Sequence, residues 1–236
     1  MGPSGEEIDL NMTNVMADNF ESAIRAAWLQ ALHVLDSSFP TGAYVHSFGL
    51  ETLAPGDAGQ LQNALVLRLQ ETLARFELVF LQHAYTHDLV ALDDSLHAML
   101  LAREPREASA LIGTHLLRAA CDLFDNARIK TFLAEGRHHH QPIAFGALYA
   151  ALSLPADLAA EAYAFGALRG QVAAAQRMGW LGQRDAQRVL HALKPAVSAA
   201  VAQASQISLE EAGAFAPAWD IACMAHERAP ARMFAS

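Results

Sequence analysis

Three observations predict an all-α fold for this chain, a single-domain bundle of roughly eight to ten helices. Alanine, the residue with the highest helix propensity, occupies 49 of the 236 positions. Apolar residues recur at helical spacings of three and four along nearly the whole chain. No segment shows the sustained alternation, rich in Val, Ile and Thr, that indicates a β-strand.

The first part of the chain contains two clear helical segments. Glu21–Leu35 carries apolar residues at steps of three and one, and Leu61–Ala84 carries one uninterrupted apolar row. Asp57 and Gln60 have the spacing of a capping box at the start of the second helix. Further apolar residues on its other faces predict that this long helix lies in the interior.

Shorter helices follow, divided by polar or turn-forming segments. We expect an interruption at Arg103–Arg106 and a polar loop at Glu135–Gln141. Pro195 should kink the helix in which it lies, because proline removes a backbone donor. The helices predicted after residue 95 are Leu96–Leu101, Ala108–Phe132, Ile143–Leu152, Pro155–Met178, Gln183–Leu193 and Ala218–Glu227.

Charge and cysteine content exclude several classes of protein. Sixteen Lys and Arg residues against 25 Asp and Glu residues give a formal net charge of −9, so no basic footprint for nucleic acid is present. The two cysteines, Cys121 and Cys223, form no CxxC pair, which fits a reducing compartment and predicts a cytoplasmic protein. Apolar stretches end well before about 18 residues, so no membrane span is expected.

Composition also suggests how the chain is divided. Residues 1–18 are polar and acidic and are expected to form a disordered leader. Residues 19–227 are expected to form the helical domain, and residues 228–236 a C-terminal tail that binds a partner and does not belong to the core. The combination of 53% apolar and 17% charged residues favours surface buried between subunits, and hence a homodimer.

The segment between the first two helical regions is the most informative. Residues 36–51 read Asp-Ser-Ser-Phe-Pro-Thr-Gly-Ala-Tyr-Val-His-Ser-Phe-Gly-Leu-Glu. Pro40 restricts the backbone and Gly42 permits a tight turn. Ser47 and Gly49 are small enough for another element to approach closely. A turn between helices would account for these residues, but a turn does not need so elaborate a segment.

This segment resembles the signature of the UreF family of urease accessory proteins, approximately Pro-x-Gly-Ala-Phe-x-x-Ser-x-Gly-Leu-Glu. Tyr44 takes the place of the family Phe, and the matching residues are Pro40, Gly42, Ala43, Ser47, Gly49, Leu50 and Glu51. Phe145-Gly146-Ala147 with Leu154-Pro155 is similar to a second stretch of the family. The closing family pattern is similar to Asp220–Glu227 followed by Arg232-Met233-Phe234, although Pro230-Ala231 replaces its Tyr-Ser.

The resemblance implies a function in the assembly of a metallocentre. Members of this family are homodimeric scaffolds or chaperones, not enzymes, that assist nickel insertion into apo-urease. The resemblance implies binding to the UreD/UreH accessory protein and recruitment or regulation of the UreG GTPase. It implies no cofactor for the chain itself, and no nucleic-acid or membrane partner.

Interfaces of this kind draw most of their binding energy from a few aromatic or Arg anchors. The candidate anchors here are Phe39, Tyr44, Phe48, Arg228, Arg232 and Phe234. The complete set of candidate partner-binding residues consists of Phe39, Pro40, Gly42, Tyr44, His46, Ser47, Phe48, Gly49, Glu51, Asp220, His226, Glu227, Arg228, Arg232 and Phe234.

Two alternatives give the chain a different role. The first is a helical metal-transfer protein that binds nickel through His138–His140 and through His83 and His87, which share one helix face. The sequence pairs no third or fourth ligand with either group, so no metal residues are assigned. The second alternative is a regulator that contributes a residue such as Arg232 to a partner GTPase.

No constellation in the sequence indicates catalysis. Ser47 is not part of a GxSxG elbow, and Cys121 has apolar neighbours, so both are interpreted as packing residues. The interleaved charges of Arg103-Glu104 and Arg106-Glu107 are interpreted as a solvated turn with weak ion pairs.

Overall fold

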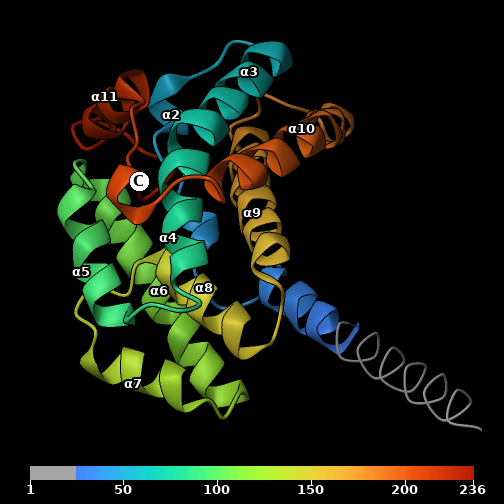
Figure 1. The fold of residues 1–236 in the computed structure, drawn as a ribbon. Coiled ribbons are helices and arrows are strands. Elements are labelled where there is room, and N and C mark those ends of the chain that lie inside the picture. Colours follow the sequence, from blue (N-terminus) through green and yellow to red (C-terminus); the bar gives the residue numbers. More distant parts are fainter. Residues whose placement is uncertain (1–24) are drawn as a thin grey trace, which may run out of the picture.

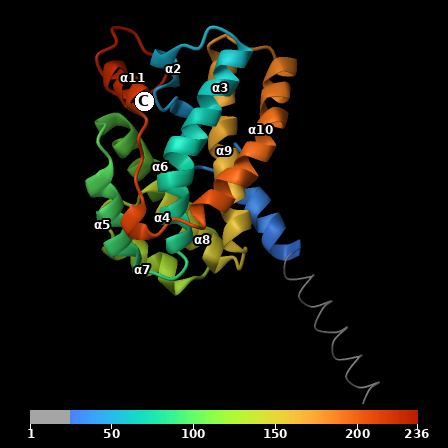
Figure 2. The ribbon, with the colours of Figure 1, turned by 45° about the horizontal axis from the view of Figure 1, so that its top comes forward.

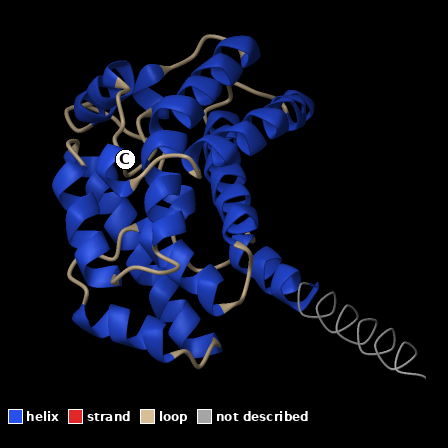
Figure 3. Ribbon diagram, in the orientation of Figure 1, coloured by secondary structure: helices blue, strands red, loops and turns tan. Residues whose placement is uncertain are grey.

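A computed structural model of the protein describes residues 25–236. The expected leader at residues 1–18 and the start of the first helix lie outside these residues. All regular elements between residues 25 and 236 are helices, which confirms the predicted all-α class (Figure 3). None of these described helices is long and apolar enough to cross a membrane.

The described chain begins with a helix at residues 25–35. The elements that follow are η1 (Ala43–Val45), α2 (Leu50–Leu53), α3 (Ala58–Arg68), η2 (Leu69–Glu77), α4 (Leu78–His83), α5 (Leu89–Met99), α6 (Arg103–Leu123), α7 (Ala127–Glu135), α8 (Gln141–Ala151), α9 (Ala156–Arg177), α10 (Gln183–Ala204), η3 (Leu209–Glu211) and α11 (Pro217–His226). Of these, η1 and η3 are 3-10 turns, and η2 is a π-helical stretch.

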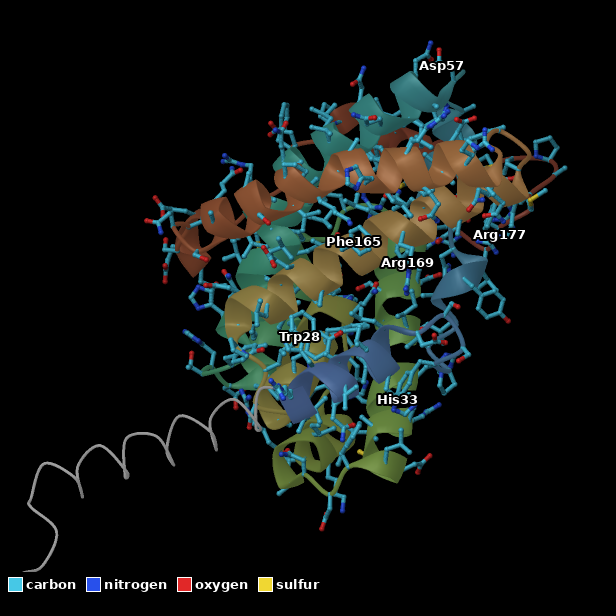
Figure 4. The ribbon with its side chains drawn as sticks, turned by 90° about the vertical axis from the view of Figure 1, so that its right-hand side faces the viewer. Trp28, His33, Asp57, Phe165, Arg169 and Arg177 are labelled. Atoms are coloured by element: carbon cyan, nitrogen blue, oxygen red, sulfur yellow. The ribbon has the colours of Figure 1, made fainter. Side chains whose placement is uncertain are left out.

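α3, η2 and α4 form one continuous helix, which agrees with the long helix predicted for Leu61–Ala84. Its first turn is capped by Asp57, whose carboxylate accepts from the Gln60 amide at 2.8 Å. This helix runs through the middle of the molecule (Figure 1; Figure 2). α9 and α10 pack along one side of it, and α8 packs against α4 on another. The helix at residues 25–35, which carries Trp28 and His33, lies along α9 (Figure 4).

α8 is a buried helix that packs against α4, α5, α6, α7 and α9. Residues 142–149 are all buried, because this helix is apolar on every face. Gly146 lets α8 approach α4 closely, since a Cβ atom there would lie 2.4 Å from the Leu81 carbonyl oxygen. α6 also packs against α8. The predicted helix Ile143–Leu152 is confirmed within two residues.

Several predicted boundaries were wrong. Arg103–Arg106 is the first turn of α6 and not an interruption; Pro105 is tolerated there because the first turn leaves its amides unpaired. The helix predicted at Leu96–Leu101 is the end of α5, which begins at Leu89 after the Asp88 cap. Ala108–Phe132 is divided between α6 and α7, because the chain leaves the helix at Phe124 and Asn126 caps the next one.

Pro195 lies inside α10, and the helix continues past it to Ala204. The residues that follow the proline, among them Val197 and Val201, are buried. Burial of this apolar face offsets the lost backbone hydrogen bond, so the helix that begins at Gln183 continues past Pro195, as predicted.

Candidate protein-binding site

Segments from the first and the last parts of the described chain meet at one end of the molecule. They are residues 40–51, α11, and residues 227–236, and Glu104 from the start of α6 joins them. We call this set of residues the C-terminal junction. The end of the described chain lies beside α11 and α2 (Figure 1; Figure 2). The junction therefore brings together the two segments that carry the sequence motifs.

Backbone hydrogen bonds attach the last residues to the first segment. The Ser236 carbonyl oxygen accepts from the amides of Ser47 at 2.6 Å and Phe48 at 3.0 Å. The Ser47 hydroxyl donates to the same oxygen at 2.8 Å. The Ala235 amide donates to the Val45 carbonyl at 2.8 Å. Residues 235–236 are thus held as firmly as an internal element of the fold.

An ionic network lies next to these bonds. His226 is fully buried, with Nδ1 at 2.7 Å from a Glu104 oxygen and Nε2 at 3.0 Å from a Glu51 oxygen. The guanidinium of Arg232 donates to the second oxygen of Glu104 at 2.6 Å. Arg103 Nε donates to Glu227 at 2.9 Å. Because each carboxylate in this network is paired or hydrogen-bonded, the buried charges are compensated.

Glu51 connects α2 to the end of the chain. Its carboxylate accepts from the amides of Met233 at 2.8 Å and Phe234 at 3.2 Å. Partial burial opposes ionisation, but the hydrogen bonds from Met233, His226 and Phe234 outweigh it and lower the pKa of the Glu51 carboxyl. Glu51 is therefore charged at neutral pH and fixes the path of residues 233–234.

Two glycines explain the shape of residues 40–51. Gly42 has φ +75° and Gly49 has φ +83°, a left-handed conformation that glycine adopts without strain. Gly49 also faces α11 at close range, since a Cβ atom there would lie 2.6 Å from Cys223 Sγ. The predicted tight turn at Gly42 and the predicted close approach at Gly49 both agree with the structure.

Aromatic side chains complete the junction. Trp219 Nε1 donates to the Phe48 carbonyl at 2.6 Å, and the Arg68 guanidinium lies over both rings at 5.4 Å from Phe48 and 5.3 Å from Trp219. Phe234 is buried, with Arg177 at 4.4 Å from its ring centre. Residue 234 therefore belongs to the hydrophobic core.

The expectation that the tail stays outside the core was wrong. Phe234 and Ser236 are buried, because hydrogen bonds and packing fold residues 233–236 onto the domain. Phe39 is buried as well and packs edge-on against His33 at 5.4 Å. Neither Phe39 nor Phe234 is thus exposed to a partner in this conformation.

The candidate residues divide into two groups. His46, Ser47, Gly49 and His226 are buried with Phe39 and Phe234, while Gly42, Phe48, Glu51 and Asp220 are half-buried. Burial raises the pKa of Asp220. The exposed members are Pro40, Tyr44, Glu227, Arg228 and Arg232.

Exposed apolar side chains lie on the same segments. Tyr44 is 65% exposed, and on α11 Ile221 is 65% and Met224 is 46% exposed. Val45 and Met233 add to this group. Large apolar side chains beside charged ones are typical of a protein-binding surface with a polar rim. We call Tyr44, Val45, Ile221, Met224 and Met233 the junction surface.

Comparison with known proteins identifies the family. The UreF family model matches residues 56–194. The urease accessory protein UreF of Paenarthrobacter aurescens is 35% identical over 210 residues, which cover 85% of this chain and 94% of the relative. That of Geobacillus kaustophilus is 32% identical over 220 residues, with 89% and 97% covered. The chain belongs to the UreF family.

The family model begins after the Pro40 segment and ends before α11, yet the aligned UreF relatives extend over most of the chain.

The junction residues that the sequence did not reveal are Glu104, Arg103 and Trp219. Arg103 and Glu104 had been interpreted as part of a solvated turn, which is wrong for Glu104 because its carboxylate is buried. The partners of Arg103 and Glu104 are more than a hundred residues away in the sequence, so no local pattern predicts these contacts.

The histidines of this UreF-family chain occupy an unexpected position. His139 and His140 are buried rather than solvated, because the Asp93 carboxylate accepts from their amides at 2.6 and 2.7 Å. His97 stacks on His138, with ring centres 3.5 Å apart, and its Nδ1 lies 3.0 Å from His140 Nε2. Between residues 25 and 236, no group of three or more His, Cys, Asp or Glu side chains is arranged to hold a metal ion.

Proposed function

We propose that this chain acts in urease maturation as a UreF-type scaffold or chaperone for nickel insertion into apo-urease. Its membership of the UreF family supports this role, and its relatives are named urease accessory proteins. In this proposal the chain is not an enzyme and works in the cytoplasm. It binds the UreD/UreH accessory protein and recruits or regulates the UreG GTPase.

The observation that carries the proposal is the junction surface on a rigid base. Tyr44, Ile221 and Met224 are exposed, whereas the backbone beneath them is fixed by Glu51, His226 and the Ser236 carbonyl. A pre-organised surface loses little conformational entropy on binding. The junction therefore presents apolar anchors in one arrangement, with Arg228 and Glu227 at their rim.

Co-purification with the partner proteins tests this role. Ile221→Asp and Tyr44→Asp place a charge on the junction surface without removing a buried contact. Both should abolish co-purification with UreD/UreH and UreG and leave the melting temperature unchanged, because a desolvated charge opposes association. Leu123→Asp is the matched control, since Leu123 is also an exposed apolar residue, 54% accessible, at the far end of α6. Retention of both partners by the two junction variants would contradict the assignment of this surface.

The homodimer is the second part of the proposal. Its support is the composition, 53% apolar with 17% charged residues, together with exposed apolar side chains such as Leu29 and Leu101. A stable interface of this kind buries more than about 2,000 Å² in total. Light scattering at micromolar concentration should give twice the chain mass of 25.4 kDa. A monodisperse monomer would contradict the dimer.

GTP turnover separates a passive scaffold from a regulator. Arg232 is the residue that the regulatory alternative requires, but its guanidinium is held by Glu104 in this structure. An unchanged turnover rate of UreG in the presence of this chain supports the scaffold, and a changed rate that Arg232→Gln reverses supports the regulator.

A further inference from the structure

A large cavity lies behind the junction, lined in part by residues 41–48. Its volume is about 670 Å³, within the range of roughly 300–1,000 Å³ found for pockets that bind small organic molecules. Much of the remaining wall comes from α9 and from the helix formed by the end of α3 and η2. α8 and α11 each contribute a few residues. Arg169 and Arg177, which line it, lie on α9 beside residues 36–48 (Figure 4).

Three buried polar side chains on this cavity have an atom without a hydrogen-bond partner among residues 25–236. They are His46 at Nε2, Arg68 at Nη1 and Gln171 at Oε1. The exposed fractions of these residues are 6%, 7% and 1%. Buried polar atoms in folded proteins are almost always paired. Three unpaired atoms on one cavity therefore indicate a polar ligand.

The three side chains surround one short stretch of backbone. The Gln171 side-chain amide lies 3.5 Å from the Ser47 carbonyl, and the Arg68 guanidinium lies over the Phe48 ring. The His46 ring is centred 5.8 Å from that of Phe48. His46 Nδ1 is already engaged by the Ser236 hydroxyl at 2.8 Å, so Nε2 remains free to carry the proton and donate it. All three side chains thus lie against residues 47 and 48.

Arg68 determines the charge of the ligand. Its Nη2 atom forms a 4.0 Å ion pair with Glu77 Oε1, which is beyond hydrogen-bond distance, and the other oxygen of Glu77, Oε2, accepts from the Tyr163 hydroxyl at 2.6 Å. Nη1 has no hydrogen-bond partner among residues 25–236, so the guanidinium keeps an unused donor inside the protein. A planar guanidinium fork matches the two oxygens of a carboxylate, and such charge-assisted hydrogen bonds are the strong ones.

The rest of the wall is largely apolar, with Phe76, Leu96 and Phe145 from three different helices. We propose that this cavity binds a small organic carboxylate with an aromatic or branched apolar body, whose carboxylate accepts from Arg68 and from His46 Nε2. Gln171 Oε1 accepts from a hydroxyl or amide on the same molecule. This ligand site goes beyond the partner-binding role proposed above, although Tyr44 both lines the cavity and belongs to the junction surface.

Trp219 lines the cavity and provides the test, since its fluorescence reports a ligand beside it. The full-length chain is titrated with phenylacetate and with 4-methylpentanoate. At least one should change the fluorescence saturably and raise the melting temperature, and the change should disappear in Trp219→Phe. Phenylacetamide, the uncharged isostere of phenylacetate, should bind about tenfold more weakly or worse, because it cannot accept two charge-assisted bonds.

Variants identify the binding groups. Arg68→Gln and Gln171→Leu should each weaken carboxylate binding, the first by about tenfold or more. Arg188→Gln is the matched control, because Arg188 is an exposed arginine that pairs with Asp185 on α10 and does not line the cavity. The amide comparison on the unaltered chain keeps the test valid if Arg68→Gln fails to fold. Absence of saturable binding by both acids, or equal binding of acid and amide, would overturn the proposal.

Discussion

Gly49 shows how one small residue sets the position of a whole helix. Its φ of +83° strains any side chain, and a Cβ atom would lie 2.6 Å from Cys223 Sγ on α11. Gly49→Ala should lower the free energy of unfolding by about 2–4 kcal/mol, about 1–2 kcal/mol from the backbone and the rest from the contact. Chemical denaturation monitored by circular dichroism measures this loss.

Gly179→Ala is the control that separates the two causes. Gly179 has a similar φ of +77°, but a Cβ atom there would meet nothing within 4 Å. Gly179→Ala should therefore cost only the backbone strain of about 1–2 kcal/mol. Equal losses in the two variants would show that the approach of α11 to Gly49 has no energetic weight.

Some features of individual residues could be predicted from the sequence, and others could not. The positive φ at Gly42 and the close approach at Gly49 were predictable, because only glycine fits such positions easily. The burial of Glu104 was not, since its partners His226 and Arg232 come from the other end of the chain. Local patterns describe local backbone, and long-range pairing of charges leaves no periodic signal.

At the scale of elements, helix periodicity was informative and helix boundaries were less so. The long helix through Leu65 and Phe80 and the buried helix α8 follow from their apolar rows. The break between α6 and α7 contains neither glycine nor proline, and Asn126 is its only cap signal. The start of α6 was missed for the opposite reason, because Pro105 suggested a break where the helix begins.

Residues 228–236 form an integral part of the fold, so their loss should destabilise the protein. Phe234→Ala should lower the free energy of unfolding by about 3–5 kcal/mol, as is typical when a buried aromatic ring is removed. Deletion of residues 228–236 should cost at least as much, since it also removes the hydrogen bonds to Ser47 and Phe48. Denaturant titration of both variants measures these losses.

Arg228→Ala provides the matched control for the segment, because Arg228 is exposed and its side chain can be removed without opening the core. Its stability should stay within about 0.5 kcal/mol of the unaltered chain. A truncated chain that melts like the full chain would contradict the integral role of residues 228–236 and restore the view of a detachable tail.

At the scale of the whole molecule, buried histidines should make the fold sensitive to acid. Burial, followed by the charges of His97, His138 and Arg106, lowers the pKa of His140 to about 3. Burial also lowers the pKa of His46. The unfolded chain, with an ordinary histidine pKa of about 6.5, then binds more protons than the folded chain below that pH. Each such group contributes stability that is complete above about pH 6.5 and is lost as the pH falls.

Asp93 opposes this trend. Burial, only partly offset by hydrogen bonds from His140 and His139, raises the pKa of its carboxyl. The folded chain therefore takes up this proton at a higher pH than the unfolded chain, and stability falls as the pH rises through that range. A comparison with a variant is needed to isolate His140 from this opposing group.

His140→Gln removes the titrating ring and keeps a side chain of similar length. The free energy of unfolding of the unaltered chain should fall between about pH 6 and pH 5 more steeply than that of the variant, by about 1.4 kcal/mol per pH unit. The reason is that the unaltered chain takes up one more proton on unfolding than the variant does. His191→Gln, on the exposed face of α10, should keep the slope of the unaltered chain. Urea titrations at the two pH values measure all three slopes. Parallel slopes for the unaltered chain and His140→Gln would mean that the histidine cluster opens to water before the fold is lost, and that its burial does not limit acid stability.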